Sequence, residues 1–296
     1  MSWQLRAIEV GARLLRKTTG PEGPERMQKQ IDKARAKTPR TAPPGVIARA
    51  LDVQAGTVDG ITVFDARPRN VQARHHVVYL HGGSYTFEIS PFHWRFISEI
   101  AKSAQAHFTV PIYPLAPEQT ADKTVPAMAD IVERAIDQFG TDHVTVMGDS
   151  AGGGMALAVA QALRDRGKQP ARIILISPWL DVTLSEPKAR EIEPYDVMLS
   201  IDGLRYCGLQ YAGVLNPQDP KVSPMFGRMS GLAPVVTFMG THDIFFADIA
   251  PLAAAMKRDG AQLTVREGAT LPHVYPILPI PEAKPARAEI VSLIKA

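Results

Sequence analysis

The feature that most constrains this chain is a glycine–serine turn between an apolar segment and a helical one. Residues 143–154 read His-Val-Thr-Val-Met-Gly-Asp-Ser-Ala-Gly-Gly-Gly, so Ser150 stands between Gly148 and Gly152. A serine on a tight turn from a strand into a helix is typical of a catalytic nucleophile. Side chains at the flanking positions would collide with the strand and the helix, and glycine removes them. The pattern predicts a nucleophilic Ser150; the alternative is a glycine-rich loop that only starts a helix or holds a phosphate.

Apolar runs alternate with helical stretches through most of the chain. Val77-Val78-Tyr79-Leu80 and Ile173-Ile174-Leu175-Ile176 are continuously apolar, which is typical of strands buried on both faces of a mostly parallel sheet. We therefore expect an α/β fold with eight strands and helices on both faces of the sheet. The first two strands should form a hairpin around residues 58–60. The expected strands are 49–55, 61–67, 75–81, 107–112, 143–148, 172–177, 235–240 and 262–267, and the expected helices are 3–17, 24–37, 92–105, 125–139, 151–166, 200–213 and 248–259.

A second glycine motif lies upstream, where a predicted strand ends in His81-Gly82-Gly83. Attack on a carbonyl group needs two or three N–H groups directed at the negative oxygen of the tetrahedral intermediate. Glycines let the backbone turn its amides into such a site, and the amide of Ala151 would add another donor. For His81 a structural role is the preferred interpretation. A generic turn at the end of a strand is the alternative for the whole motif.

The base and the acid should follow the serine in the order acid and then histidine. His273 comes after the last predicted strand and fits the base, with His242 as its rival. Asp243 comes just beyond the strand 235–240 and fits the acid. Asp248 is expected to cap a helix. Asp181 and Asp196 are interpreted as structural.

These motifs together resemble the hormone-sensitive-lipase-like family of esterases, which have the α/β-hydrolase fold. The resemblance rests on His-Gly-Gly at 81–83, Gly-Asp-Ser-Ala-Gly-Gly at 148–153, Gly-Thr-His-Asp at 240–243 and Pro-His at 272–273. It implies that the amides of Gly83 and Ser84 form the oxyanion hole. It also implies a helical cap, which suits an N-terminal segment of residues 1–45 and an insertion at about 180–225. Residues 46–296 would then be the catalytic domain.

Two positions depart from the family pattern. Ser84 stands where the family usually has glycine, although a serine amide can still donate a hydrogen bond. His242 stands where the family commonly has an acidic residue. The position of the aspartate itself, Asp243, is kept.

The resemblance implies an esterase that acts on carboxylic esters with short or medium acyl chains. A lactone or an amide is an alternative substrate, because the fold and the triad do not fix the leaving group. A ligand receptor without catalysis is the second alternative, since related receptors are built on this fold. Those receptors have lost a member of the triad, whereas this sequence keeps all three.

The composition limits the kinds of molecule that the chain is expected to bind. The formal charge is only +3 and is spread along the chain, so we expect no binding to nucleic acid. With Cys207 as its one cysteine the chain forms no internal disulfide. No secretory leader, zinc-type spacing or dinucleotide motif is visible, so we expect a cytoplasmic enzyme without metal or organic cofactor that acts on a small-molecule ester. A homodimer is compatible with the sequence.

The N-terminal segment allows two interpretations. Residues 3–17 form an amphipathic helix, which either contributes to the cap or binds a membrane surface. The second interpretation rests on Trp3 together with basic residues along the helix. The cap is preferred, because an enzyme with an apolar acyl pocket needs a cover, and we therefore expect no membrane contact. The basic residues concerned are Arg6, Arg13, Arg16 and Lys17.

Overall fold

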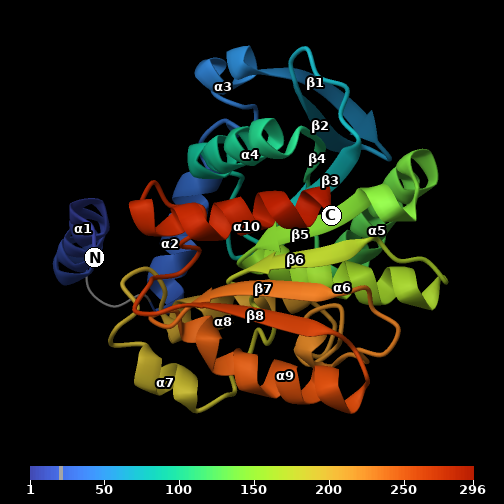
Figure 1. The fold of residues 1–296 in the computed structure, drawn as a ribbon. Coiled ribbons are helices and arrows are strands. Elements are labelled where there is room, and N and C mark those ends of the chain that lie inside the picture. The colour runs from blue at the N-terminus through green and yellow to red at the C-terminus, as the bar shows by residue number, and fades with distance from the viewer. Residues whose placement is uncertain (20–22) are drawn as a thin grey trace.

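The computed structural model of the protein describes residues 1–19 and 23–296, except for the side chains of residues 15–19. Its centre is an eight-stranded sheet in the order β1-β2-β4-β3-β5-β6-β7-β8 (Figure 1). The pairs β1–β2 and β2–β4 are antiparallel and the remaining pairs are parallel. The predicted α/β fold with an eight-stranded, mostly parallel sheet is thus confirmed. The strands are β1 (Leu51–Val58), β2 (Ile61–Pro68), β3 (His75–Leu80), β4 (Ala106–Ile112), β5 (Val144–Asp149), β6 (Arg172–Ile176), β7 (Val235–Gly240) and β8 (Leu263–Gly268).

Helices cover both faces of this sheet. Seven of them were expected from the sequence, with ends that differ by a few residues, and three were not: α3, α7 and α10. The helices are α1 (Trp3–Thr19), α2 (Pro24–Arg35), α3 (Gly45–Ala50), α4 (Pro91–Ala104), α5 (Ala121–Phe139), α6 (Ala151–Asp165), α7 (Lys188–Ile192), α8 (Ile201–Ala212), α9 (Ile249–Arg258) and α10 (Lys284–Lys295).

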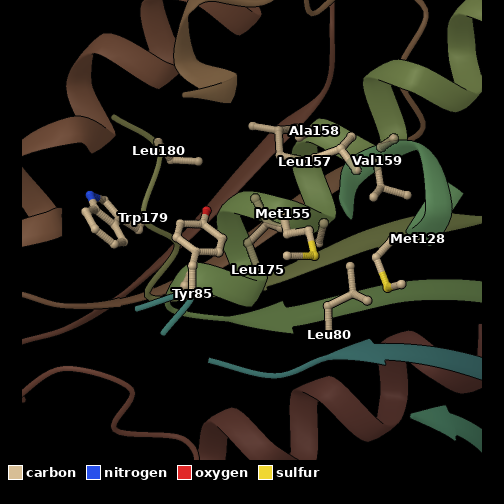
Figure 2. Packing of buried hydrophobic residues seen from close by; sticks show 14 of the residues in the cluster. Leu80, Tyr85, Met128, Met155, Leu157, Ala158, Val159, Leu175, Trp179 and Leu180 are labelled. Carbon is tan, nitrogen blue, oxygen red and sulfur yellow. The ribbon is translucent and has the colours of Figure 1, made fainter. Parts of the chain in front are cut away.

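The alternation of side chains along the central strands divides the core in two. On β3, Val78 and Leu80 belong to a cluster with α5, α6 and α9, whereas Val77 and Tyr79 belong to a cluster with α3, α4 and α10. All four side chains are fully buried, and full burial of one such apolar side chain contributes about 1.5–3 kcal/mol. Figure 2 shows part of the first cluster, where Met155 of α6 lies near Leu80. Both faces of the parallel strands are therefore covered by apolar side chains and shielded from solvent.

Residues 178–233, between β6 and β7, contain no strand, in agreement with the sequence. This segment includes α7 and α8, and α8 packs against α2 from the N-terminal region. Arg35 at the end of α2 donates hydrogen bonds to the carbonyl oxygens of Thr86 and Ala116, both at 2.9 Å. Segments far apart in the sequence thus meet above the loop that follows β3.

The prediction that the Asp248 side chain caps the start of a helix is wrong. Residues Ile244–Asp248 form a 3-10 turn that continues directly into α9, so Asp248 has helical backbone angles and makes no side-chain cap. The carboxyl group that accepts at the start of this turn is that of Asp243, which receives the N–H of Phe245 at 3.0 Å. Burial is the largest cause, and the nearby charge of Asp181 the second, of a pKa of Asp248 well above its ordinary value.

Candidate active site

Ser150 lies on the sharp turn between β5 and α6. Its backbone angles are φ 53° and ψ −124°, a sparsely populated region for a residue with a side chain. A Cβ added at Gly148 would lie 2.2 Å from the carbonyl oxygen of Gly152, and one added at Gly152 would lie 2.1 Å from that of Leu80. Both positions therefore require glycine. The turn holds Ser150 at the start of α6, whose N-terminal end carries a partial positive charge.

Three side chains that are distant in the sequence form a hydrogen-bonded chain at this turn. His273 Nε2 lies 3.0 Å from Ser150 Oγ, and His273 Nδ1 lies 2.8 Å from Asp243 Oδ2. A carboxylate only accepts, so Nδ1 carries the proton and Nε2 is left to accept from the serine hydroxyl. All three residues are buried. The structure thus brings together Ser150, His273 and Asp243, each from a different strand end.

His242 takes no part in this chain. Its ring stacks against Tyr195, with 5.4 Å between the centroids, and is partly exposed. His81 does not bond to the serine either: its ring stacks on Tyr113 and its Nδ1 is 2.7 Å from the carbonyl oxygen of Gly82. Burial, and to a smaller extent the neighbouring His93, lower the pKa of His81 to about 4. The ring is therefore neutral near pH 7.

A second buried carboxylate fixes the loop that carries Asp243. Asp196 accepts the backbone N–H groups of Met198 and Leu199 on Oδ1, at 2.8 and 2.9 Å, and that of Ile244 on Oδ2 at 3.0 Å. Burial and the charge of Asp243 raise the pKa of Asp196 to about 6. The residue is structural, as the sequence suggested, and its place is directly beside Asp243.

The pKa of His273 is governed by opposing effects. Burial lowers it, but the charge of Asp243 and the hydrogen bond to that residue raise it, and the net change is upward from the ordinary histidine value. The imidazolium form is therefore favoured relative to a free histidine. This is the state that a general base reaches after it accepts a proton.

The loop after β3 supplies backbone amides near Ser150. The N–H of Gly82 is already used, because it donates to Asp149 Oδ1 at 3.0 Å. Within residues 1–19 and 23–296, no acceptor is found for the amides of Gly83, Ser84 and Ala151. Gly83 and Ser84 both have positive φ, 128° and 51°, so the chain turns sharply at this point. Three amides are thus free to bind a ligand oxygen.

Asp149 anchors this loop, a role that sequence reasoning missed. Its carboxylate accepts from Tyr79 OH at 2.5 Å as well as from Gly82, and His93 Nε2 lies 3.2 Å from its Oδ2. The N–H of Ser90 donates to His93 Nδ1, so the proton of a neutral His93 is on Nε2 and points at Asp149. Burial alone would raise the pKa of Asp149, but the proximity of His93 and these hydrogen bonds lower it. The only signal in the sequence was the aspartate inside Gly-Asp-Ser.

Aromatic rings form a continuous wall from the triad to α8. Phe245 meets the His273 ring edge-on at 5.2 Å, and it stacks on Trp179 at 5.7 Å between centroids. Tyr85, which directly follows Ser84, stacks on Trp179 at 5.5 Å and on Tyr211 at 3.6 Å. Figure 2 shows Tyr85 facing Trp179. These rings pack against one side of His273 and support the loop that carries the free amides.

The side chains that commonly ligate metals do not gather into a metal centre. No group of three or more histidine, cysteine, aspartate or glutamate side chains in the described part of the chain is arranged to hold a metal ion. Among helices of the same residues, none has the length and apolar character needed to cross a bilayer.

Residues 77–277 match the family model of the α/β-hydrolase fold, and the chain belongs to this family. A triacylglycerol lipase of Mycobacterium tuberculosis is 37% identical over 68% of this chain, although the match spans only 42% of that lipase. An acetyl-hydrolase of Streptomyces hygroscopicus is 30% identical over 75% of this chain and 76% of its own length. The fold is shared with an esterase of the bacterial hormone-sensitive lipase family, at a TM-score of 0.83 and 24% identity, with 100% of this chain and 98% of that chain covered.

These relatives confirm the α/β-hydrolase fold and the likeness to esterases and lipases. The class they define is that of carboxylic ester hydrolases.

Proposed function

We propose that the protein hydrolyses carboxylic esters of small molecules, with short or medium acyl chains, through Ser150, His273 and Asp243. The observation that carries this proposal is the hydrogen-bonded chain from Asp243 Oδ2 through His273 to Ser150 Oγ, with distances of 2.8 and 3.0 Å. The position of Ser150 on a strained turn beside three free amides supports the same assignment. Such an arrangement suits acyl transfer.

In the first half of the reaction Ser150 Oγ attacks the ester carbonyl carbon and its proton passes to His273 Nε2. The amides of Gly83, Ser84 and Ala151 bind the resulting oxyanion. The intermediate collapses, the bond to the alcohol oxygen breaks, and His273 protonates the leaving alcohol. Asp243 stays ionised throughout and stabilises the imidazolium.

In the second half water replaces the alcohol. His273 Nε2 takes a proton from the water as its oxygen attacks the acyl carbon of the acyl-enzyme. The same amides bind the second oxyanion. Collapse releases the carboxylic acid and returns the proton to Ser150 Oγ, so the enzyme is regenerated without a cofactor.

We propose further that α2 and the insertion at about 180–225 form the cap over this site. Tyr206 of α8 is hydrogen-bonded to Gln28 of α2, and Arg35 joins α2 to the carbonyl oxygens of Thr86 and Ala116. These contacts support a cap that packs on the loop leading away from Ser84. Through Tyr211 of α8, the buried aromatic wall links this cap to His273.

The test of the substrate class is a series of p-nitrophenyl esters from acetate to palmitate, with a γ-lactone and an anilide beside it. We expect kcat/KM to peak at short or medium chains, because the similar Streptomyces protein is an acetyl-hydrolase and the aromatic wall is closely packed. Faster opening of the lactone than of any ester would contradict the substrate assignment but not the triad. A peak at palmitate would contradict the chain length.

The dependence of the rate on pH follows from the environment of His273. The base must be neutral to accept a proton, so kcat/KM should be lost as the pH falls through its pKa. Because that pKa is raised, the acidic limb should have its midpoint above about 6.5, the value of an ordinary histidine. Hydrolysis of p-nitrophenyl butyrate from acid to neutral pH measures this limb. A midpoint well below that value would show that Asp243 does not stabilise the charged ring.

Gly82→Ala should damage the oxyanion loop while keeping all three side chains of the triad. A Cβ at this position would lie 2.3 Å from Asp149 Oδ2 and 3.0 Å from Ser150 Cβ, and Tyr79 holds the Asp149 carboxylate in place. The loop must therefore shift, and we expect kcat to fall by roughly 10²–10³, as when an oxyanion donor is lost. Gly56→Ala is the matched control, since nothing lies within 4 Å of its added Cβ. Equal kcat in Gly82→Ala and Gly56→Ala would exclude this role for the loop.

A further inference from the structure

Helix α1 carries an apolar stripe on its outward face. Trp3, Ala7, Val10 and Leu14 follow one another at helical spacings of three and four residues, so they share one side of the helix. This side faces solvent: Trp3 is 75% exposed, Val10 56% and Leu14 58%. Large apolar side chains gathered on one exposed face are unusual on a free protein surface and mark a contact surface.

The opposite face of α1 attaches the helix to the protein. Leu5 is fully buried in the cluster beneath α4 and α10, and Ile8 packs against the same cluster. Ser2 caps the helix by accepting the N–H of Leu5 at 3.2 Å, and its own hydroxyl donates to Glu282 at 2.8 Å. Figure 1 shows α1 at one side of the molecule, with its outer face away from the sheet. The stripe is therefore not needed for the attachment.

Basic side chains border the stripe. Arg6 and Arg13 are seven residues apart, which places them on the same flank, and both are exposed. Neither is joined to an acidic group among residues 1–19 and 23–296. Arg16 and Lys17, which the sequence interpretation also used, have side chains outside the described residues. The outer surface of α1 thus combines a tryptophan, aliphatic side chains and two arginines. Glu9 lies between these arginines on the same flank, but neither arginine forms an ion pair with a described acidic group.

Because this face of α1 is exposed, we propose, in place of the cap preferred from the sequence, that α1 binds the surface of an anionic lipid bilayer through it. The helix would lie in the plane of the interface, with Trp3, Val10 and Leu14 at the boundary between headgroups and acyl chains. Arg6 and Arg13 would contact the anionic headgroups, each strengthening binding about fivefold. A second copy of the chain is the weaker candidate. One helix face offers less than the ~800 Å² per partner of a stable interface, and it would bring like charges together.

The tryptophans of this protein make the test direct. Trp94 and Trp179 are 1% and 0% exposed, so Trp3 is the tryptophan that iodide can quench. The chain of residues 1–296 is titrated with vesicles of about three parts phosphatidylcholine to one part phosphatidylglycerol. We expect the fluorescence to shift to the blue and the iodide quenching to disappear. In Trp3→Phe neither change should occur.

Charge and apolar variants separate the two parts of the contact. Arg6→Gln with Arg13→Gln should weaken binding by about 25-fold, and about 0.5 M salt should have a similar effect on the unmodified protein. Val10→Asn should weaken it too, whereas Val46→Asn, at a residue 75% exposed in α3, should not. Hydrolysis of a water-soluble ester should be the same in all of these variants.

Three results would overturn the proposal. The fluorescence could stay unchanged with vesicles while iodide still quenches Trp3. Binding could persist in the combined Arg6, Arg13 and Val10 variant, which would put the lipid contact elsewhere. Iodide quenching of Trp3 could instead be lost when the protein concentration is raised without vesicles, together with a doubled mass in gel filtration. The face would then be an interface between two copies.

Discussion

Ser150→Ala should lower kcat for p-nitrophenyl butyrate on the order of 10⁶-fold, because the serine, the histidine and the acid act as a unit. The serine hydroxyl makes its side-chain hydrogen bond to His273 alone among the described residues, so its removal leaves the packing of β5 and α6 in place. Binding of the substrate should change little, and the loss should appear in kcat. Stopped assays with high enzyme concentration are needed to measure the residual rate.

The matched control is Ser103→Ala, at an exposed serine near the end of α4, which should keep the full rate. Circular dichroism and thermal unfolding of both variants establish that each is folded. If the folded Ser150→Ala variant kept more than about one thousandth of the rate, another group would be the nucleophile.

Asp243→Asn should have the second largest effect, a loss of about 10⁴ in kcat. An amide can still accept the N–H of Phe245 through its oxygen, so the start of the turn before α9 is retained. Its NH₂ group would then face His273 Nδ1 and force the proton onto Nε2. In that tautomer the ring cannot accept the serine proton. The hydrogen bond of 2.8 Å from His273 to Asp243 is thus required for the direction of proton transfer.

His242→Gln is the control for this variant, because His242 directly precedes Asp243 but stacks on Tyr195 instead of bonding to the serine. It should keep kcat within a few-fold. A loss of about 10⁴ in His242→Gln together with a mild effect of Asp243→Asn would overturn the assignment of both the base and the acid. Measuring the pH profile of each variant distinguishes a lost base from a displaced one.

The central strands and the elbow could be predicted because their physical requirements are local. A continuous apolar run such as 77–80 needs two dry faces, and only helices on both sides of a sheet supply them. Gly148 and Gly152 are required by contacts of 2.2 and 2.1 Å with backbone oxygens, which leave no room for any side chain. The order of the motifs along the chain then pointed to His273 and Asp243.

The supporting contacts could not be predicted, because they depend on which strands become neighbours. Tyr79 and Asp149 are 70 residues apart and meet only because β3 pairs with β5. His93 reaches the same carboxylate from α4, across the sheet edge. The error at Asp248 has a similar origin: the turn before α9 is helical, and the carboxylate that begins it is the one that also holds His273.

The most direct test of the triad is covalent labelling with a fluorophosphonate, followed by mass spectrometry of the intact protein and of its peptides. If Ser150 is the nucleophile, one adduct forms, it maps to the peptide containing residues 143–154, and esterase activity is lost in proportion to labelling. The Ser150→Ala variant should then remain unlabelled. An adduct on a different peptide, or full esterase activity in the protein labelled at Ser150, would contradict the assignment.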